Sequence, residues 1–574
     1  MTDQDYDVAI IGGGPAGSTL GTLLRKYDPE LRVLILEREK FPREHVGESQ
    51  LPPIGAVLEE MGCWDKVEAA NFPIKVGATY RWGKKADLWD FEFLAEGQFQ
   101  DEPRPAKYEG QRVQTAFQVE RAIYDDILLR HAEEVGVEVR EETAVVRVHS
   151  EGDRVTALEL KDGSRVTAKH YVDASGHSGL LRRSMGIDVT VPTSLKNIAL
   201  YDYWENAEWA VEIGVGGTRV QVMSQSAGWL WFIPLGPTRT SIGFVCPAEY
   251  YKSVDETPEE LYQRVIQADE RIAPLVEKAT CRGKLESVTD WSFLSQRNAG
   301  ENWFLAGEAA GFADPVLAAG LTLTHTGARD LAYVILELER GELEARWLKQ
   351  SYDEIQRQRI HQHIRFADFW YASNGQFTDL QENCAEIARE AGLRLTPAAA
   401  WTWLAQGGFT HDVVGQVGIG GLDISALKQI TQLFSQQKAH WNLNDYNVFR
   451  LRTQGAKESF LPNFKEGRVE KVPCFVRGDR RLPMTGMFKI VVDQLRLTPD
   501  IVGFRAGLQA ALSTQLPPAH AKVAFDHAIQ ALEVMISEGW VDAKLKKNKQ
   551  KFGVESPTDG GLIHPNREGG GDAG

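Results

Sequence analysis

The feature that most constrains the fold is a glycine-rich turn near the N-terminus, Gly12–Gly17, with the spacing G-x-G-x-x-G. It follows a short apolar run over residues 6–12, which is typical of a buried strand, and precedes a helical apolar pattern over residues 15–26. A second apolar run from Val33 to Glu37 completes a β-α-β unit of about 30 residues. The sequence therefore predicts an α/β fold that begins with a Rossmann-like domain.

Each glycine in this turn has a separate physical role in binding a dinucleotide. Gly12 permits the tight turn, Gly14 lets the backbone approach a pyrophosphate, and Gly17 lets the helix pack closely on the strand. The helix N-terminus supplies amide donors and a partial positive charge to the phosphates. The carboxylate at the end of the second strand accepts ribose hydroxyls. The predicted contacts from this unit are Gly12, Gly14, Ala16, Gly17, Glu37 and Arg38.

Composition excludes several classes of protein. The net charge of −16 argues against a nucleic-acid partner, whose phosphates need a basic surface. No run approaches twenty apolar residues, and aspartates occupy the N-terminus where a signal peptide needs positive charge, so we expect a cytoplasmic chain without a membrane span. The five cysteines form no C-x-x-C pair, and His361 and His363 point apart on a helix, so no metal site is predicted.

At 574 residues the chain is too long for one ordinary core. We expect the dinucleotide-binding module to extend over 1–340, with a second sheet at about 72–118 and 185–300. Helical periodicity then predicts a mostly helical domain over 341–556. The Gly-rich, polar stretch 557–574 predicts a disordered tail.

Two further segments indicate which dinucleotide the chain binds. Phe304–Gly320 joins a predicted strand to a predicted helix through a loop with glycines at both ends. It resembles the second FAD fingerprint of the flavin monooxygenase superfamily, with Glu308 in place of the usual Asp. Arg121, followed by Asp125, matches the arginine that lies over the flavin in that superfamily, and Val172–Gly176 matches its loop near the adenosine. The resemblance implies FAD contacts at Ser49, Arg121, Gly307, Glu308, Asp314 and Gly320.

Within that superfamily the chain is most similar to flavin-dependent halogenases, over roughly residues 5–335. Gly228–Pro234 reads G-W-L-W-F-I-P and matches the halogenase W-x-W-x-I-P signature. Ile74–Gly83 resembles the segment with the catalytic lysine of pyrrole, phenol and aliphatic halogenases, and Lys75 falls on that lysine. Phe41–Arg43 and Val46–Ser49 fit the family's linker after the second strand. The implied fold is the FAD-binding fold of aromatic hydroxylases, with an antiparallel substrate sheet.

The resemblance also implies a mechanism. Reduced FAD from a separate flavin reductase reacts with oxygen to give a C4a-hydroperoxide, which oxidises halide to hypohalous acid. Trp229 and Trp231 would block direct oxygen transfer, and Lys75 would hold the positive halogen near an electron-rich substrate. Burial would lower the pKa of this lysine. The halide itself would bind backbone amides at the start of a helix, at Ala319, Gly320 and Leu321.

Alternatives stay open at this point. The two tryptophans alternate along a strand and could pack a core, and a single lysine is usually a surface residue. A single-component FAD hydroxylase or epoxidase and a reductase of the geranylgeranyl type share the fold. Tryptophan halogenases use a Glu just before the Gly turn, where this chain has Val316–Ala319, so free tryptophan is not the expected substrate. Whether the substrate is free or tethered to a carrier protein is left open.

Overall fold

The computed structural model divides the chain into two compact units. Unit 1 comprises residues 1–368, 466–469 and 560–574, and unit 2 comprises 369–465 and 470–559. Each is described separately. The structure describes residues 5–82, 87–94, 99–100, 102–191, 196–289, 292–374, 440–478, 480–555 and 563–566.

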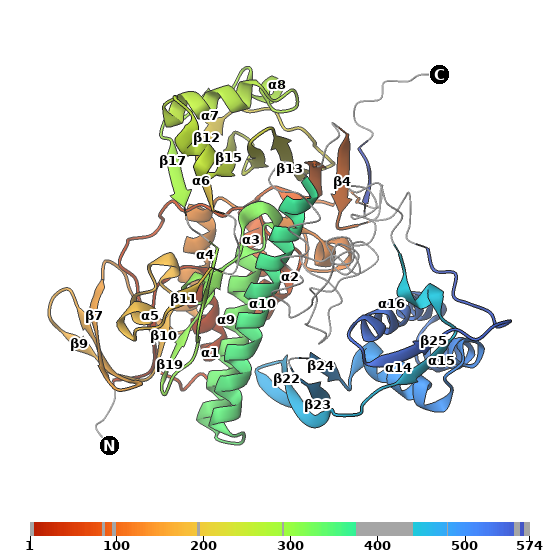
Figure 1. Ribbon diagram of the computed structural model, residues 1–574. Helices are drawn as coiled ribbons and strands as arrows, with labels where there is room; N and C mark the ends of the chain where they lie inside the picture. The colour runs from red at the N-terminus through yellow and green to blue at the C-terminus, as the bar shows by residue number, and fades with distance from the viewer. Residues whose placement is uncertain are drawn as a thin grey trace. The chain divides into compact units, whose positions relative to one another are not determined.

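A five-stranded parallel sheet forms the centre of unit 1, in the order β19-β10-β1-β2-β6. Strands β1 and β2 are buried almost throughout because, after Tyr6 and Asp7 at the start of β1, they consist of Val, Ile, Leu and Ala side chains. Helices α1 and α9 pack together beside them (Figure 1). This arrangement confirms the predicted Rossmann-like α/β class. The bounds are β1 Tyr6–Ile11, α1 Pro15–Tyr27, β2 Val33–Leu36, β6 Glu138–Arg140, β10 Ala168–Asp173, β19 Trp303–Leu305 and α9 Gly320–Arg340.

Further helices and two small sheets surround this core. The helices are α2 Pro53–Met61, α3 Trp64–Ala69, α4 Arg121–Glu134, α5 Leu180–Ser184 and α10 Ala345–Asn374. One antiparallel sheet contains β7 Val145–Glu151, β8 Arg154–Leu160 and β9 Arg165–Val166, and the other contains β11 Val189–Thr190, β18 Phe293–Ser295 and β20 Gly311–Phe312. Short 3₁₀ turns lie at Gly110–Gln114 and Gly176–Ser178.

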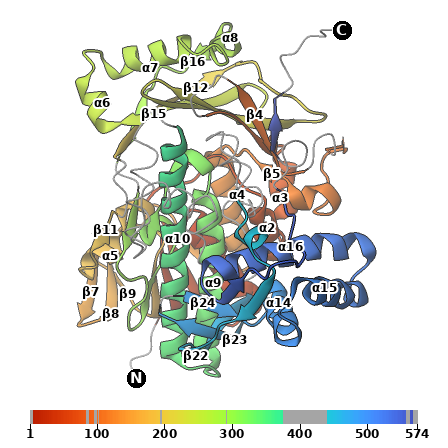
Figure 2. The same cartoon turned by 45° about the vertical axis from the view of Figure 1, so that its right-hand side comes forward.

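A second, larger sheet is mostly antiparallel and has the order β16-β12-β15-β14-β13-β3-β4-β26. Helices α6, α7 and α8 cover one face of it, where Leu230 and Phe232 are buried (Figures 1 and 2). The opposite face contains Trp229 and Trp231. The bounds are β3 Ile74–Arg81, β4 Leu88–Glu92, β5 Ala116–Phe117, β12 Asn197–Glu205, β13 Gly217–Gln225, β14 Gly228–Pro234, β15 Arg239–Pro247, β16 Thr280–Cys281, β17 Glu286–Thr289, α6 Ala248–Ser253, α7 Pro258–Gln267 and α8 Ala273–Val276.

The described part of unit 2, within 440–555, differs from the mostly helical domain that we predicted. Helices α14, α15 and α16 share an apolar core, but an antiparallel pair β21-β25 and a three-stranded sheet β22-β23-β24 accompany them. Period-two alternation around Gly467 favours strands over a helix there. The bounds are β21 Val448–Leu451, β22 Lys457–Lys465, β23 Arg468–Arg477, β24 Arg480–Pro483, α14 Gly486–Leu497, α15 Ile501–Gln515, α16 Pro518–Ser537, β25 Val541–Lys544 and a 3₁₀ turn at Asn442–Asp445.

The predicted disorder of residues 557–574 is wrong for one stretch. Strand β26, Ile563–Pro565, pairs antiparallel with β4 at the edge of the large sheet. Backbone hydrogen bonds to an open edge fix this stretch, although its composition resembles that of a disordered tail. Within the described ranges, no helix combines the length and apolarity needed to cross a membrane.

Candidate functional site

The glycine turn after β1 is shaped for close approach. A Cβ on Gly12, whose φ is +105°, would lie 2.4 Å from the carbonyl oxygen of Ala174. A Cβ on Gly17 would lie 2.0 Å from the oxygen of Gly12, so this glycine is needed for α1 to pack on the turn. A Cβ added at Gly14 would meet, among the described residues, the flexible side chain of Arg43 alone within 4 Å, at 3.3 Å. The space above Gly14 therefore fits a pyrophosphate.

The carboxylate of Glu37 is held in place directly beyond β2. Its Oε2 accepts a hydrogen bond from the Gly13 amide at 2.7 Å, and its Oε1 accepts one from the Glu39 amide at 2.9 Å. Each oxygen keeps a lone pair for a ribose hydroxyl. Arg38, predicted as a further contact, is mostly exposed and pairs with Glu39. Its contact with the cofactor stays a prediction.

Two arginines meet a single buried carboxylate at the start of α4. Arg121 donates to both oxygens of Asp125, at 2.8 and 2.9 Å, and to the carbonyl oxygen of Val46 at 2.8 Å. Arg43 donates to Asp125 at 3.1 Å. Burial opposes ionisation of Asp125, but Arg121 outweighs it and lowers the pKa of this carboxyl. Arg43 therefore presents a guanidinium between Asp125 and Gly14, a position that we did not predict.

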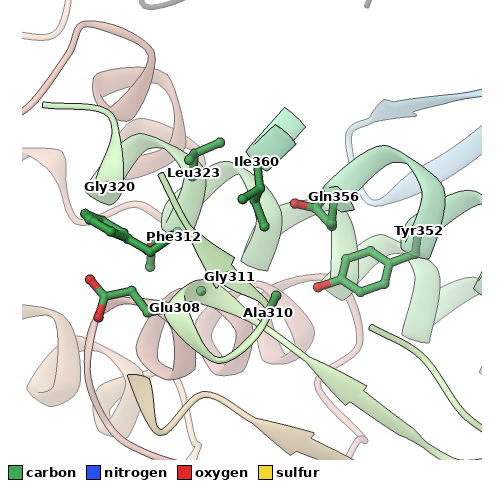
Figure 3. A pocket seen from close by; sticks show the side chains of 11 residues that line it. Glu308, Ala310, Gly311, Phe312, Gly320, Leu323, Tyr352, Gln356 and Ile360 are labelled. Atoms are coloured by element: carbon green, nitrogen blue, oxygen red, sulfur yellow. The ribbon is translucent and has the colours of Figure 1, made fainter. Parts of the chain in front are cut away.

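The second fingerprint leads from β19 to α9. Gly307 begins a 3₁₀ turn, Gly307–Ala309, and its Cβ would lie 3.0 Å from the Cβ of Ala16 in α1, so the two glycine motifs adjoin. Glu308, Gly307 and Gly320 line a pocket whose other wall is α10 (Figure 3). Gln356 of α10 lines it too, and its buried Nε2 has no hydrogen-bond partner among the described residues. This pocket contains polar groups that a bound molecule can satisfy.

The end of the fingerprint places backbone amides at the start of α9. Asp314 accepts a hydrogen bond from the Val316 amide at 2.9 Å and caps a short 3₁₀ turn, Pro315–Leu317. Ala318 has φ +55°, Ala319 is the N-cap, and α9 begins at Gly320. The first amides of a helix lack intrahelical acceptors, so those of Gly320 and Leu321 remain available to an anion. Asp314 thus shapes the loop.

Lys75 is buried in β3, with 2% of its surface exposed. Its Nζ donates a hydrogen bond to the Ser49 hydroxyl at 2.8 Å and lies 5.6 Å from the centre of the Phe93 ring. Burial lowers the pKa of Lys75 to about 7. Its burial excludes the alternative that Lys75 is an ordinary surface lysine. Ser49, predicted as a cofactor contact, is placed by the structure beside this amine.

Trp229 and Trp231 belong to a row of aromatic rings on the face of the sheet opposite α6–α8. Their centroids are 6.0 Å apart, Trp82 lies 6.4 Å from Trp229, and Tyr201 lies 6.1 Å from Trp231. Trp231 Nε1 donates to the Ser241 hydroxyl at 3.1 Å. Both indoles are buried, so they form a dense wall.

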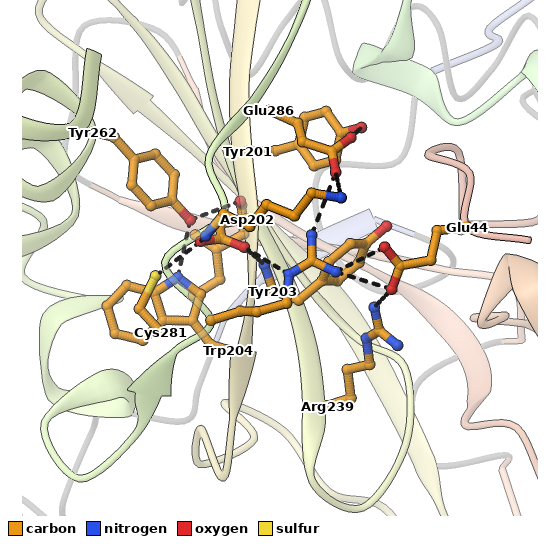
Figure 4. Close-up of polar contacts among 12 residues, drawn as sticks. Glu44, Tyr201, Asp202, Tyr203, Trp204, Arg239, Tyr262, Cys281 and Glu286 are labelled. Atoms are coloured by element: carbon orange, nitrogen blue, oxygen red, sulfur yellow. Dashed lines mark hydrogen bonds and ion pairs between the residues drawn. The ribbon is translucent and has the colours of Figure 1, made fainter. Parts of the chain in front are cut away.

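A polar cluster that the sequence did not reveal joins this sheet to the linker after β2 (Figure 4). The Tyr203 hydroxyl donates to Glu48 at 2.9 Å, and burial raises the pKa of Glu48. Arg239 and Arg282 lie over the Tyr203 ring, at 4.1 and 4.8 Å, and both donate to Glu44. The linker that contains Ser49 is thus anchored to the sheet that contains Lys75.

One further buried side chain adjoins this linker. Gln118 forms an isolated β-bridge with Ser49 and is fully buried, and within the part of the chain that the structure describes neither atom of its side-chain amide has a partner. Such orphaned groups commonly mark a place for a ligand or water. The space above Gly14, the carboxylate of Glu37 and the side-chain amide of Gln118 are each suited to contact part of a dinucleotide. Such a molecule would extend from the glycine turn toward the second FAD fingerprint.

The fold and these residues define an FAD-binding oxidoreductase with a separate, aromatic-walled sheet. Residues 7–102 and 92–379 match the family described as tryptophan halogenase. The chain belongs to this family of flavin-dependent halogenases, whose cofactor is FAD and whose co-substrate is halide. The predicted recognition, enzyme class and cofactor are therefore confirmed.

Individual relatives agree with this assignment. The 1H-pyrrole-2-carbonyl-[peptidyl-carrier protein] chlorinase of Pseudomonas fluorescens is 31% identical over 393 residues, which cover 66% of this chain and 86% of the relative. The structure of the myxobacterial chondrochloren halogenase CndH is 28% identical, with a TM-score of 0.59, over 75% of this chain and 97% of that one. The flavin-dependent halogenase CmlS, at 24% identity, shares the fold over 97% of this chain and 99% of its own, with a TM-score of 0.71.

Proposed function

We propose that this protein uses reduced FAD and oxygen to halogenate an electron-rich organic substrate, with Lys75 relaying the halogen. The observation that carries the proposal is the buried amine of Lys75, hydrogen-bonded to Ser49 and with a pKa of about 7. A structural lysine at this depth is normally paired with a carboxylate. A lysine that is half neutral near pH 7 is instead suited to react.

The residues that would hold FAD extend across unit 1. The glycine turn and Arg43 would bind the pyrophosphate, Glu37 the ribose, and Glu308 the ribityl chain. Reduced flavin with oxygen would supply the oxidant that converts halide to hypohalous acid. Amides of Gly320 and Leu321 would hold the halide, because a helix N-terminus favours an anion.

The chain's own residues then direct the halogen. The wall formed by Trp229 and Trp231 would keep the organic substrate away from the flavin, which prevents direct oxygen transfer. A neutral Lys75 amine can form an N–halogen bond with hypohalous acid and release water, or hold the acid by a hydrogen bond. Either route keeps an electrophilic halogen beside the substrate.

The substrate class and the electron donor follow from this chemistry. Phenols and pyrroles are electron-rich enough to accept a positive halogen, and the Pseudomonas fluorescens relative acts on a carrier-bound pyrrole. We propose such a ring, free or carrier-tethered. A separate flavin reductase would supply the reduced cofactor, because the sequence contains no second G-x-G-x-x-G motif between a strand and a helix that could bind NAD(P)H.

The test is a product assay with reduced FAD, oxygen, chloride or bromide, and a panel of phenols and pyrroles. Mass spectrometry should show halogen insertion, and Lys75→Ala should abolish it while flavin oxidation continues. Hypohalous acid released by the variant should then chlorinate monochlorodimedone. Oxygen insertion in place of halogen, or rapid flavin reduction by NADPH alone, would favour the single-component hydroxylase.

A further inference from the structure

The direction of Lys75 depends on an irregularity in β3. Side chains alternate between faces along a strand, so Lys75 and Tyr80, five residues apart, would ordinarily point to opposite sides. Yet Lys75 reaches Ser49, and the Tyr80 hydroxyl donates to the carbonyl oxygen of Val316, so both face the FAD-binding part. The register against β13 slips at this point: Lys75 pairs with Thr218 and Gly77 with Arg219, so Val76 has no partner in β13. This bulge turns Lys75 toward the site.

Strand β4 holds the bulge from the other side. The amide of Phe93, just past β4, donates to the carbonyl oxygen of Val76 at 2.9 Å, and its ring lies beside the Lys75 amine. Gly77 allows this approach, because a Cβ there would lie 2.2 Å from the carbonyl oxygen of Phe91. The place of Lys75 therefore depends on where β4 lies.

The outer edge of β4 is covered by residues 563–566, here named the returning segment. The Asn566 amide donates to the Leu88 carbonyl oxygen at 2.9 Å, and its side-chain Nδ2 lies 3.0 and 2.9 Å from the two oxygens of Asp90. Asp90 is buried and also accepts from Thr79 of β3 at 2.6 Å and pairs with Arg219 of β13 at 3.4 Å. One carboxylate thus joins β3, β4, β13 and the returning segment.

We propose that the returning segment is a positioning element for Lys75, with Asn566 as its positioning residue. Without the returning segment, β4 becomes an open edge strand and the buried Asp90 carboxylate loses a hydrogen-bond donor. The bulge at Val76 then loses the fixed strand against which it is formed. This inference rests on the proposed role of Lys75, but its structural part can be tested without turnover.

The experiment compares a chain that ends at residue 566 with one that ends at 559, both with bound FAD. Amides of residues 74–82 and 87–93 should exchange with solvent roughly tenfold faster in the shorter chain, the effect of losing one hydrogen bond to a charged group. Lys75 should become more reactive toward acetic anhydride. Flavin oxidation should continue, while the ratio of halogenated product to hypohalous acid trapped by monochlorodimedone should fall severalfold.

Point variants in the full chain decide the matter if the shorter chain is insoluble. Asn566→Ala should lower the same ratio, and Asn566→Asp should lower it further, because it adds a carboxylate beside buried Asp90. Equal exchange, Lys75 acylation and product ratios across all these chains would overturn the proposal. If none of these chains halogenates a substrate, the proposed function fails. Amide hydrogen exchange and the acylation of Lys75 then still decide whether the returning segment positions the lysine.

Discussion

The Lys75 amine and the Ser49 hydroxyl are joined by a 2.8 Å hydrogen bond that connects the substrate sheet to the linker after β2. Among the described residues, no carboxylate forms an ion pair with this amine. The pair therefore gives Lys75 a fixed direction without stabilising its charge as an acid would. The same serine was predicted to contact FAD. Its substitution therefore separates a role in binding FAD from a role in directing Lys75.

Ser49→Ala should reduce halogenated product more than tenfold, because the buried amine loses its hydrogen-bond acceptor, which costs about 1–3 kcal/mol. FAD affinity, measured by fluorescence titration, should change little, and Ser49→Thr should retain most activity because it keeps the hydroxyl. A large loss of FAD affinity with normal use of hypohalous acid would identify Ser49 as a cofactor contact.

Halogenation should depend on pH through Lys75. The neutral amine is the reactive form, and its pKa is about 7, so the rate of product formation should rise from pH 6 to 8 with a midpoint near 7. Flavin oxidation, followed by absorbance, should lack this step. Lys75→Arg should show little product at any pH, because a guanidinium keeps its proton. Substantial activity in this variant would favour hydrogen bonding over the N–halogen bond.

Lys75→Met should stabilise the protein while it inactivates it. The depressed pKa means that, between pH 7 and the usual value of 10.5, the unfolded chain binds a proton that the folded chain does not. The free energy of unfolding therefore rises with pH across this window, and the gain from Lys75→Met is largest at and below pH 7, at most about 5 kcal/mol. Chemical denaturation at pH 7 and 10 measures this gain. A gain that does not shrink at pH 10 would contradict the assigned pKa.

Two glycines of the N-terminal turn should respond differently to substitution. Gly14→Val should fold normally and lose FAD, because its side chain would occupy the space left for the pyrophosphate. Gly17→Ala should destabilise the fold itself, because its Cβ would lie 2.0 Å from a backbone oxygen. Thermal melts and FAD titrations of both variants separate these effects. Unchanged FAD affinity in the Gly14 variant would refute the N-terminal site.

Gly243→Ala should displace Trp231, which is directly opposite Gly243 on the neighbouring strand. The new Cβ would lie 2.2 Å from the indole of Trp231, so the ring must move, at a cost of about 1–3 kcal/mol. Product formation should fall more than FAD binding does. Gly236→Ala is the control, because in the described ranges nothing beyond its chain neighbours lies within 4 Å of a Cβ there. Equal activity of both variants would mean that the position of Trp231 does not matter.

The sequence predicted most of what local patterns determine. The strand, glycine turn, helix and second strand of the N-terminal unit follow from short-range periodicity, and the structure places Glu37 at the predicted strand end. It also predicted that Lys75 and the tryptophan pair belong to one sheet region. These features need only a few neighbouring residues to specify them.

Features that depend on distant partners were not predictable. Nothing near Val76 indicates a bulge, because the slip exists only relative to β13. Arg43 belongs to the linker after β2, and its direction depends on Asp125, far along the chain. Apolar and polar residues alternate on both sides of Glu466-Gly467, which indicates two strands joined by a turn. The prediction of a helical domain followed the helical periodicity before residue 440 instead.

The pairing of β26 with β4 has a consequence for synthesis. Asn566 lies 476 residues beyond its partner Asp90. At about 5–20 residues per second, a ribosome needs roughly half a minute to a minute and a half to cover that interval. Until residues 563–566 have been made, β4 is paired with β3 alone, and its outer edge, beside Asp90, lacks its partner β26. The halogenase sheet is therefore completed late, and slow translation or premature termination leaves an edge open to other chains.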